Sequence, residues 1–336
     1  MTHRLTRKAI PQLAATLVAG TVLAGTASAE VQLRMAGIVP EGHPATEAMN
    51  EFAERAAEQS DGEIDIRVFP ANQLGDYTQI YEELRRDTIE FALIPVPSQF
   101  DSRLELPSLN YAVSSWDQAK EMMARDGFIA EEMAQLHANL DVKQIGGLYA
   151  NGFGGLGLTE LPEDIHDPTS EKDVLLRVPP IDVFKVAMDD LGFQTVTVPY
   201  AELYNAMQTG VAEGWTGGQA EINYTNFRDV IDYYVPVNNF FESYAFLMSA
   251  ETWEGLSAEN QEIIREIAID LVDKSFETAR ESEETYLKRL DESGVEVVEF
   301  TDEDRERWAE YVRETTWPKL HDRLSEELIN RLREQY

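Results

Sequence analysis

The chain has 336 residues, no cysteine, and 62 acidic against 28 basic residues, which gives a formal net charge of −34 at pH 7. Nucleic-acid binding is excluded because it needs a basic surface, and adhesion to an anionic membrane is disfavoured for the same reason. Without cysteine there are no thiol nucleophiles or cysteine metal sites, and a chain of this length can fold without disulfides. The length suits two domains. The surplus of acidic residues indicates a solubilising surface and suggests that the source organism lives in a saline habitat.

The first 29 residues predict a secretory signal peptide. Residues 1–8 carry three basic side chains and no acid, residues 9–25 form an apolar run, and residues 27–29 read Ala-Ser-Ala, a small-residue cleavage site. A single membrane anchor is the weaker interpretation, because about 20 apolar residues are usually needed to span a bilayer and no stop-transfer pattern follows. We therefore expect cleavage after Ala29 and export to the periplasm. No cysteine is adjacent, so a lipid anchor is not expected.

The first half of the exported chain alternates between strand and helix patterns. Strands are predicted where apolar residues occupy every second position or form a short buried run, at residues 31–35, 64–68, 89–94 and 142–150. Helices are predicted where apolar residues recur at helical spacing, at residues 45–61, at 77–84 and from the capping box of Ser115 and Gln118.

The second half continues this alternation. Strands are predicted at residues 174–178, 194–198, 230–237, 244–249 and 295–300. Helices are predicted at residues 181–191, at 201–209, from Ser257 to about Glu292, and after a cap at Thr301. Strands separated by helices imply βαβ units and a mostly parallel sheet in each half. Because the sequence shows no linker, we expect two α/β lobes between which the chain crosses more than once, leaving a ligand cleft.

A glycine-rich segment invites a nucleotide-binding interpretation. Residues 152–157 read Gly-Phe-Gly-Gly-Leu-Gly after a predicted strand, which fits the dinucleotide fingerprint. That site also needs a helix whose N-terminus faces the pyrophosphate, and Pro162 and Pro168 argue against a helix here. A crossover between the lobes is the better interpretation.

No motif of an enzyme stands out. Nucleophile-elbow, Walker and HExxH patterns are absent from the sequence, and paired carboxylates cannot be singled out among 62 acids. His166 lies in an acidic stretch, residues 163–167, where we weigh a weak cation site against a solvated loop and favour the loop. The sequence therefore offers almost no case for catalysis, and no metal or cofactor is expected.

Arg177 is conspicuous because cations are scarce. It ends the predicted strand 174–178, directly before two prolines. In an open α/β sheet the carboxyl ends of the strands face the ligand crevice, and a guanidinium there can hold a carboxylate through two parallel hydrogen bonds. A structural ion pair with one of the many acids is an equal alternative. Aromatic residues that together could wall a cleft, although each alone is more often core, are Tyr200, Trp215, Phe240, Phe241 and Tyr244.

Four stretches, in this order and at these separations, carry a resemblance to a known family. They are residues 42–44 (GHP), 69–76 (FPANQLGD), 176–179 (LRVP) and 199–211 (PYAELYNAMQTGV). With them the chain resembles the DctP-type solute-binding proteins of TRAP transporters over nearly the whole exported length. The third and fourth stretches are the most specific.

The resemblance implies an α/β fold of the two-lobed periplasmic-binding-protein class, type II-like, with an inter-lobe cleft, crossover segments and a long C-terminal helix. The implied division is a signal peptide at residues 1–29, lobe I at 30–149 plus 240–282, and lobe II at 150–239 plus 283–336.

The resemblance also implies site residues. In the family the arginine of the RVP stretch usually holds the ligand carboxylate, which points to Arg177. The aromatic residue that follows the family's proline, here Tyr200 after Pro199, often forms a wall of the site. Family members direct the loops that carry His43 and Asp76 toward the cleft. The candidate ligand-binding set is Arg177, Tyr200, Asn151, Phe153, Trp215, Gly217, Asp76, His43 and Phe241.

Two departures from the family pattern bear on specificity. Many members carry a second arginine shortly after the Asn-Gly of the first crossover, whereas here Asn151 leads through Phe153 to Gly154. Many also read DGQENP where this chain reads Glu-Gly-Trp-Thr-Gly-Gly, so that Gly217 replaces the asparagine and Trp215 adds an indole. These changes argue against sialic acid or a C4-dicarboxylate. They favour a monocarboxylate, or an amphiphilic or zwitterionic acid with an apolar body.

The function predicted from the sequence is therefore capture of a small organic acid by an extracytoplasmic subunit. Its expected partners are a carboxylate ligand and the small and large membrane subunits of a TRAP transporter, which is driven by an ion gradient; neither nucleic acid nor direct membrane insertion is expected. The alternatives are a periplasmic hydrolase or isomerase that acts on a small carboxylate, and a binding protein coupled to a chemoreceptor.

Overall fold

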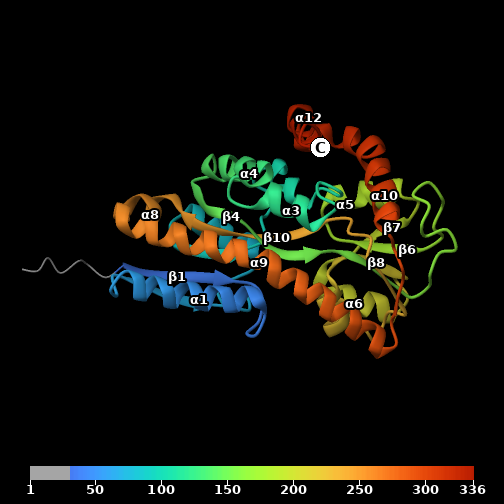
Figure 1. Ribbon diagram of the computed structural model, residues 1–336, viewed down its shortest axis with the longest axis horizontal. Helices are drawn as coiled ribbons and strands as arrows, with labels where there is room; N and C mark the ends of the chain where they lie inside the picture. Colours follow the sequence, from blue (N-terminus) through green and yellow to red (C-terminus); the bar gives the residue numbers. More distant parts are fainter. Residues whose placement is uncertain (1–30) are drawn as a thin grey trace, which may run out of the picture.

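The computed structural model describes residues 31–336, which form two mixed sheets flanked by helices (Figure 1). The predicted signal peptide lies outside the described residues. The strands are β1 (Val31–Gly37), β2 (Ile64–Phe69), β3 (Phe91–Ile94), β4 (Val142–Phe153), β5 (Gly155–Leu158), β6 (Leu175–Val178), β7 (Gln194–Thr197), β8 (Gly214–Gly218), β9 (Tyr233–Val235), β10 (Phe241–Ser249) and β11 (Glu296–Val297).

Helices cover both sheets. The α-helices are α1 (Pro44–Gln59), α2 (Tyr77–Arg85), α3 (Trp116–Met123), α4 (Phe128–Ala138), α5 (Asp182–Asp190), α6 (Tyr200–Gln208), α7 (Ala220–Ile222), α8 (Ala250–Gly255), α9 (Ala258–Ser293), α10 (Asp302–Thr315), α11 (His321–Leu324) and α12 (Glu326–Arg333). Shorter turns of helix are η1 (Ser102–Ser108), η2 (Asn223–Phe227) and η3 (Trp317–Leu320). None of the helices in residues 31–336 is long and apolar enough to cross a bilayer.

The first sheet has the strand order β2-β1-β3-β10-β4. β1 pairs in parallel with β2 and β3, whereas β10 runs antiparallel to both β3 and β4. The fully buried β3 reads Phe-Ala-Leu-Ile, as expected for a central strand covered on both faces. Helix α1 packs on β2, and helices α4 and α9 both pack on β4.

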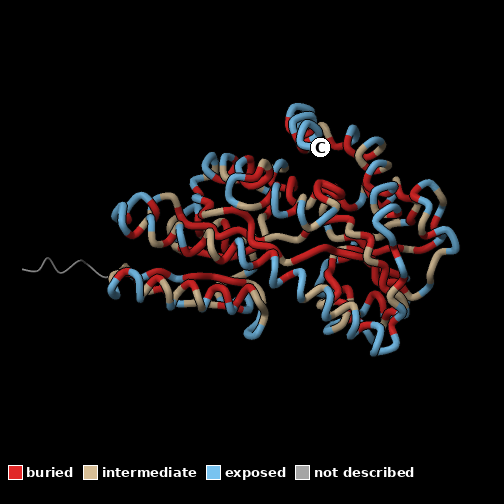
Figure 2. The backbone as a smooth tube through the Cα atoms, in the orientation of Figure 1, coloured by how far each residue is buried: buried red, intermediate tan, exposed pale blue. Residues whose placement is uncertain are grey.

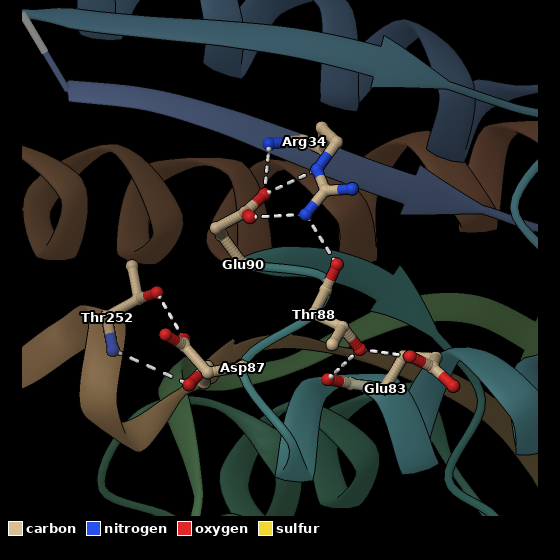
Figure 3. A network of polar contacts seen from close by, with 7 residues as sticks. Arg34, Glu83, Asp87, Thr88, Glu90 and Thr252 are labelled. Carbon is tan, nitrogen blue, oxygen red and sulfur yellow. Dashed lines mark hydrogen bonds and ion pairs between the residues drawn. The ribbon is translucent and has the colours of Figure 1, made fainter.

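One end of this sheet is tied together by a polar network (Figure 3). Arg34 on β1 donates from Nε and Nη2 to the two carboxylate oxygens of Glu90, the residue before β3, at 3.0 and 2.6 Å. The Thr252 hydroxyl of α8 donates to the carboxylate of Asp87 at 2.6 Å. Because the Arg34 side chain is about half exposed, we assign this network a role in register rather than in stability.

The second sheet has the strand order β11-β9-β5-β8-β6-β7. β6 pairs in parallel with β7 and β8, and β5 runs antiparallel to β8 and β9. Close packing explains the glycines of β5, since a Cβ at Gly155 would lie 2.5 Å from the Tyr234 hydroxyl oxygen. No helix follows β5 before β6 starts at Leu175, which excludes the dinucleotide interpretation of residues 152–157.

The chain crosses between the sheets more than once. β4 belongs to the first sheet and leads through Gly154 directly into β5 of the second, and after β9 the chain returns as β10. Helix α9 then runs diagonally across the molecule and contacts β4 and α1 in one half and α7, η2 and β11 in the other (Figure 1). The two-lobed α/β fold with crossovers and a long C-terminal helix is therefore confirmed.

The C-terminal helices contact both halves. Arg323 of α11 forms ion pairs with Glu105 of η1 at 2.5 Å and with Asp182 of α5 at 2.6 Å. Arg331 of α12 pairs with Glu132 of α4. The predicted division into lobes, which assigns residues 283–336 to lobe II, stays a prediction, and these contacts show that its C-terminal part also lies against the first half.

Buried strands run through the centre of the molecule, and exposed helix faces surround them (Figure 2). One continuous apolar core includes strands of both sheets, such as Phe91 and Phe246 in the first and Leu156 and Leu176 in the second. A smaller core lies under the C-terminal end of α9, where Leu290 packs with Trp215 and Phe227 in one cluster. This shared burial holds the crossover region, and with it the candidate site, in place.

Candidate functional site

Arg177 lies at the carboxyl end of β6 and is only 2% exposed. Its Nε donates to the carbonyl oxygen of Val198 at 2.7 Å, and its Nη1 donates to that of Thr216 at 3.4 Å. Within residues 31–336 no carboxylate pairs with it, and no hydrogen bond engages its Nη2. Burial lowers the pKa of Arg177 to about 10, which the nearby phenol of Tyr200 partly opposes. The alternative of a structural ion pair is therefore wrong.

The backbone around the guanidinium leaves room for it. Gly217, at the end of β8, has a φ of +119°, and a Cβ there would lie 3.6 Å from Arg177 Nη1. An L-residue rarely adopts this conformation, so glycine fits both the backbone and the space beside the charge. Tyr200 is the first residue of α6, is 50% exposed, and accepts a hydrogen bond from Asn226 Nδ2 at 3.1 Å.

Trp215 and Phe241 lie in the core behind this region. The Trp215 indole is buried, donates from Nε1 to Asn223 Oδ1 at 3.0 Å and packs on Phe227 with ring centroids 4.7 Å apart. Phe241 packs edge-on against Phe153 at 4.9 Å. Through these contacts both side chains pack in the core next to the site.

A cavity lies where β4 crosses between the sheets, beside α9. Its enclosed volume is ≈ 30 Å³, and ≈ 500 Å³ of empty space is reached when the open solvent at its mouth is included. Three of the predicted residues, His43, Asn151 and Phe153, line it. The Nδ2 atom of Asn151 is buried and has no hydrogen-bond partner within the described part of the chain, so a donor is available there. The complete lining is His43, Pro44, Tyr149, Ala150, Asn151, Gly152, Phe153, Gln219, Glu221, Ile222, Thr278, Ala279, Ser282 and Glu283.

The cavity does not include Arg177 itself, and the two regions are linked along the chain at the end of β8. Gly217 lies beside the guanidinium, and Gln219, two residues further along the chain, lines the cavity. Arg177 with Tyr200 and Gly217 therefore forms one end of the candidate site, and the cavity with Asn151 forms the other.

His43 and Asp76 both cap helices. His43 Nδ1 accepts from the Ala45 amide at 3.1 Å at the start of α1, and burial lowers the pKa of His43. Asp76 Oδ1 accepts from the amides of Thr78 and Gln79 at 2.8 and 3.0 Å at the start of α2. Asp76 is exposed and does not line the cavity, so its visible role is that of a cap.

Sequence reasoning missed the acidic groups of the site. Glu221 and Glu283 line the cavity, and Glu242 on β10 is held by the side chain of Gln219. Ser282 donates to Glu221 at 3.1 Å, and the Trp116 indole donates to Glu283 at 2.9 Å. Burial raises the pKa of both Glu242 and Glu283. In a sequence with 62 acids no pattern distinguishes these three, because chain crossings bring them together.

His166 lies away from this region. Its Nδ1 is 3.3 Å from Asp304 Oδ2, and its ring stacks on Phe300. Within residues 31–336 no group of three or more His, Cys, Asp or Glu side chains could hold a metal ion, so this loop is not a cation site of that kind.

Comparison with known proteins decides the family. Residues 35–320 match the family described as bacterial extracellular solute-binding protein, family 7 (DctP). The chain belongs to this family. The C4-dicarboxylate-binding periplasmic protein DctP of Rhodobacter capsulatus is 23% identical, with 96% of each chain covered.

Solved structures of DctP-type proteins share the fold. A TRAP periplasmic solute-binding protein from Ochrobactrum anthropi superposes with a TM-score of 0.80 at 23% identity, covering 91% of this chain and 95% of that one. One from Desulfovibrio salexigens with bound orotic acid gives a TM-score of 0.79 at 21% identity, covering 91% and 98%. The predicted family is thus confirmed, and solute binding is the function class of this DctP-family protein.

Proposed function

We propose that this chain is the extracytoplasmic binding subunit of a TRAP transporter, that it holds a small organic carboxylate at Arg177 between its lobes, and that it delivers this ligand to the small and large membrane subunits. The observation that carries the proposal is Arg177, a residue only 2% exposed, whose guanidinium no acid of residues 31–336 neutralises. A buried charge without a partner is costly. A ligand carboxylate would supply the missing countercharge through charge-assisted hydrogen bonds.

The remaining features support binding rather than turnover. Among the described residues the hydrogen bonds of Arg177 go only to backbone carbonyls, and no general base is hydrogen-bonded to a nucleophile beside it. The relative from Desulfovibrio salexigens holds orotic acid, a carboxylate of the expected kind. The signal-peptide pattern of residues 1–29 supports a periplasmic location for the exported chain.

The experiment is a thermal-shift screen of the purified, signal-free chain against monocarboxylates, dicarboxylates, sugar acids and zwitterionic acids. A ligand that binds the folded state alone raises stability by RT ln(1 + [L]/Kd), about 2.7 kcal/mol at a hundredfold excess over Kd. We expect at least one acid to raise Tm in a concentration-dependent manner and to be recovered chemically unchanged, as shown by NMR. Conversion of the acid would favour the enzymatic alternative, and the absence of any acid that binds would contradict the proposal.

A further inference from the structure

The candidate site carries more negative than positive charge. Three glutamates, Glu221, Glu242 and Glu283, line the cavity or contact a residue that does, and no lysine or arginine is among the lining residues. Arg177 is the cation at the other end of the site. A simple anion placed in this space would be attracted by Arg177 and repelled by each of these glutamates that is ionised. The acids therefore bear on the chemistry of the ligand.

Glu242 is the glutamate most directly placed for recognition. It lies on β10 opposite Gly152, the cavity residue with a φ of +119°, and it is half-buried. Its hydrogen bond comes from the neutral amide of Gln219, and within the described residues no cation pairs with it. The carboxylate thus keeps free acceptor capacity at the edge of the cavity.

Three tyrosines lie in the neighbourhood of this carboxylate. Tyr149 and Tyr244 are direct cross-strand partners on β4 and β10, and Tyr149 lines the cavity. The pKa of Tyr244 is raised mainly by burial, and further by the nearby Glu242, Tyr200 and Tyr149. The four groups are therefore near one another. A carboxylate with aromatic side chains nearby attracts an organic cation, because the acid supplies a negative charge and each aromatic ring carries partial negative charge on its face.

Tyr200 is influenced by both charged groups of the site. Burial raises its pKa, the hydrogen bond from Asn226 opposes this rise, and Glu242 and Arg177 act in opposite directions on it. Arg177 and Glu242 do not pair with each other. The site therefore has a basic group, Arg177, and an acidic group, Glu242, which both influence the Tyr200 phenol but do not form an ion pair with each other.

We propose that the ligand is a zwitterion, whose carboxylate binds Arg177 and whose cationic nitrogen binds Glu242 among Tyr149, Tyr200 and Tyr244. This inference rests on the proposed function and narrows its substrate class. The hydroxyl groups of a sugar acid could also donate to Glu242, but they would not offset the repulsion between the acid's own charge and the glutamates.

The test uses pairs of probes that differ in the cationic nitrogen alone. Glycine betaine is compared with 3,3-dimethylbutanoate, and L-proline with cyclopentanecarboxylate, by isothermal titration of the signal-free chain; galactonate represents the sugar acids. We expect at least one zwitterion to bind ten times more tightly than its neutral-bodied partner and more tightly than galactonate.

Variants locate the effect. Glu242→Gln keeps the shape and should lower affinity for the zwitterion at least tenfold while changing affinity for the paired monoanion less than threefold. The control is Glu254→Gln on the exposed side of α8, which should leave both unchanged. Equal loss for both probes in Glu242→Gln, or a strongest ligand that has no cationic nitrogen, would overturn the inference and leave the proposed function standing. Failure of every acid in the screen would instead overturn the proposed function.

Discussion

At the scale of the residue, the unusual feature is a charged side chain removed from water without an opposite charge. The carbonyls of Val198 and Thr216 partly solvate Arg177 and fix its plane, so its remaining donors are pre-organised. Little rotamer freedom then remains to be lost when a carboxylate binds. An ammonium cannot form the same planar fork, so we expect Arg177→Lys to lose affinity although it keeps the charge.

A second buried residue, His137 on α4, makes stability depend on pH. Its Nδ1 is 2.7 Å from the Tyr81 hydroxyl, its Nε2 has no partner within the described residues, and burial lowers its pKa to about 3. The folded state keeps this ring neutral while the unfolded chain takes up a proton below about pH 6.5, so stability is lost as pH falls. Between pH 7 and pH 5 we expect a loss of about 2 kcal/mol from this residue.

Urea unfolding at both pH values measures this loss. His137→Gln, which cannot be protonated in this range, should show a pH dependence smaller by that amount than the wild type. An identical pH dependence in the two proteins would show that His137 contributes nothing to it.

Not all of the site residues could be predicted from the sequence. Arg177 could be, because a strand that ends at two prolines places its last side chain at the sheet edge. The absence of an ion pair at Arg177 could not be predicted, because it depends on where the chain crossings place the many carboxylates. Glu242 and Tyr244 have the alternation of an ordinary strand, and the cross-strand pairing with β4 that brings them to the cavity is not local information.

At the scale of the element, α9 fixes the crossover strand through one hydroxyl. Ser275 Oγ accepts from the amide of Ala150 on β4 at 2.8 Å and donates to the Val272 carbonyl at 2.6 Å. Removing it leaves a buried amide without a partner next to Asn151. We expect Ser275→Ala to lower the free energy of unfolding by about 1–3 kcal/mol, as measured by urea unfolding.

Ser293 on the same helix supplies the control. Its hydroxyl donates to the Leu290 carbonyl at the exposed helix end, so Ser293→Ala should change stability by less than about 0.5 kcal/mol. A Ser275→Ala protein as stable as the wild type would mean that the backbone of β4 finds another partner.

The long helix was predictable, as were β6, β7 and β9 of the second sheet, but β5 and β8 were not. α9 begins after the Ser257 cap and ends at Gly294, which has a φ of +99°, so both ends have local signals. β5 and β8 are rich in glycine, which gives no periodic pattern, and neighbouring side chains such as Tyr234 and Trp215 fill the space that a Cβ would need. The strand expected at residues 295–300 is limited to Glu296–Val297, where it pairs with β9.

At the scale of the whole molecule, the two halves are joined by β4–β5, by the return to β10 and by α9. A ligand that contacts Arg177 in one half and β4 or β10 in the other stabilises the closed arrangement by its differential affinity for it. We expect small-angle scattering to show a smaller radius of gyration at saturating ligand. An unchanged radius would mean that binding does not require lobe closure.

The central claim is that Arg177 holds the carboxylate of the ligand, and calorimetry with the strongest acid from the screen tests it most directly. Arg177→Ala should weaken binding by roughly 2–5 kcal/mol, which is about 30-fold to several-thousand-fold in Kd. The control is Arg228→Ala, which should leave Kd unchanged, because among the residues that the structure describes the exposed guanidinium donates only to the η2 carbonyls of Tyr224 and Thr225. An unchanged Kd in a folded Arg177→Ala protein would contradict the account.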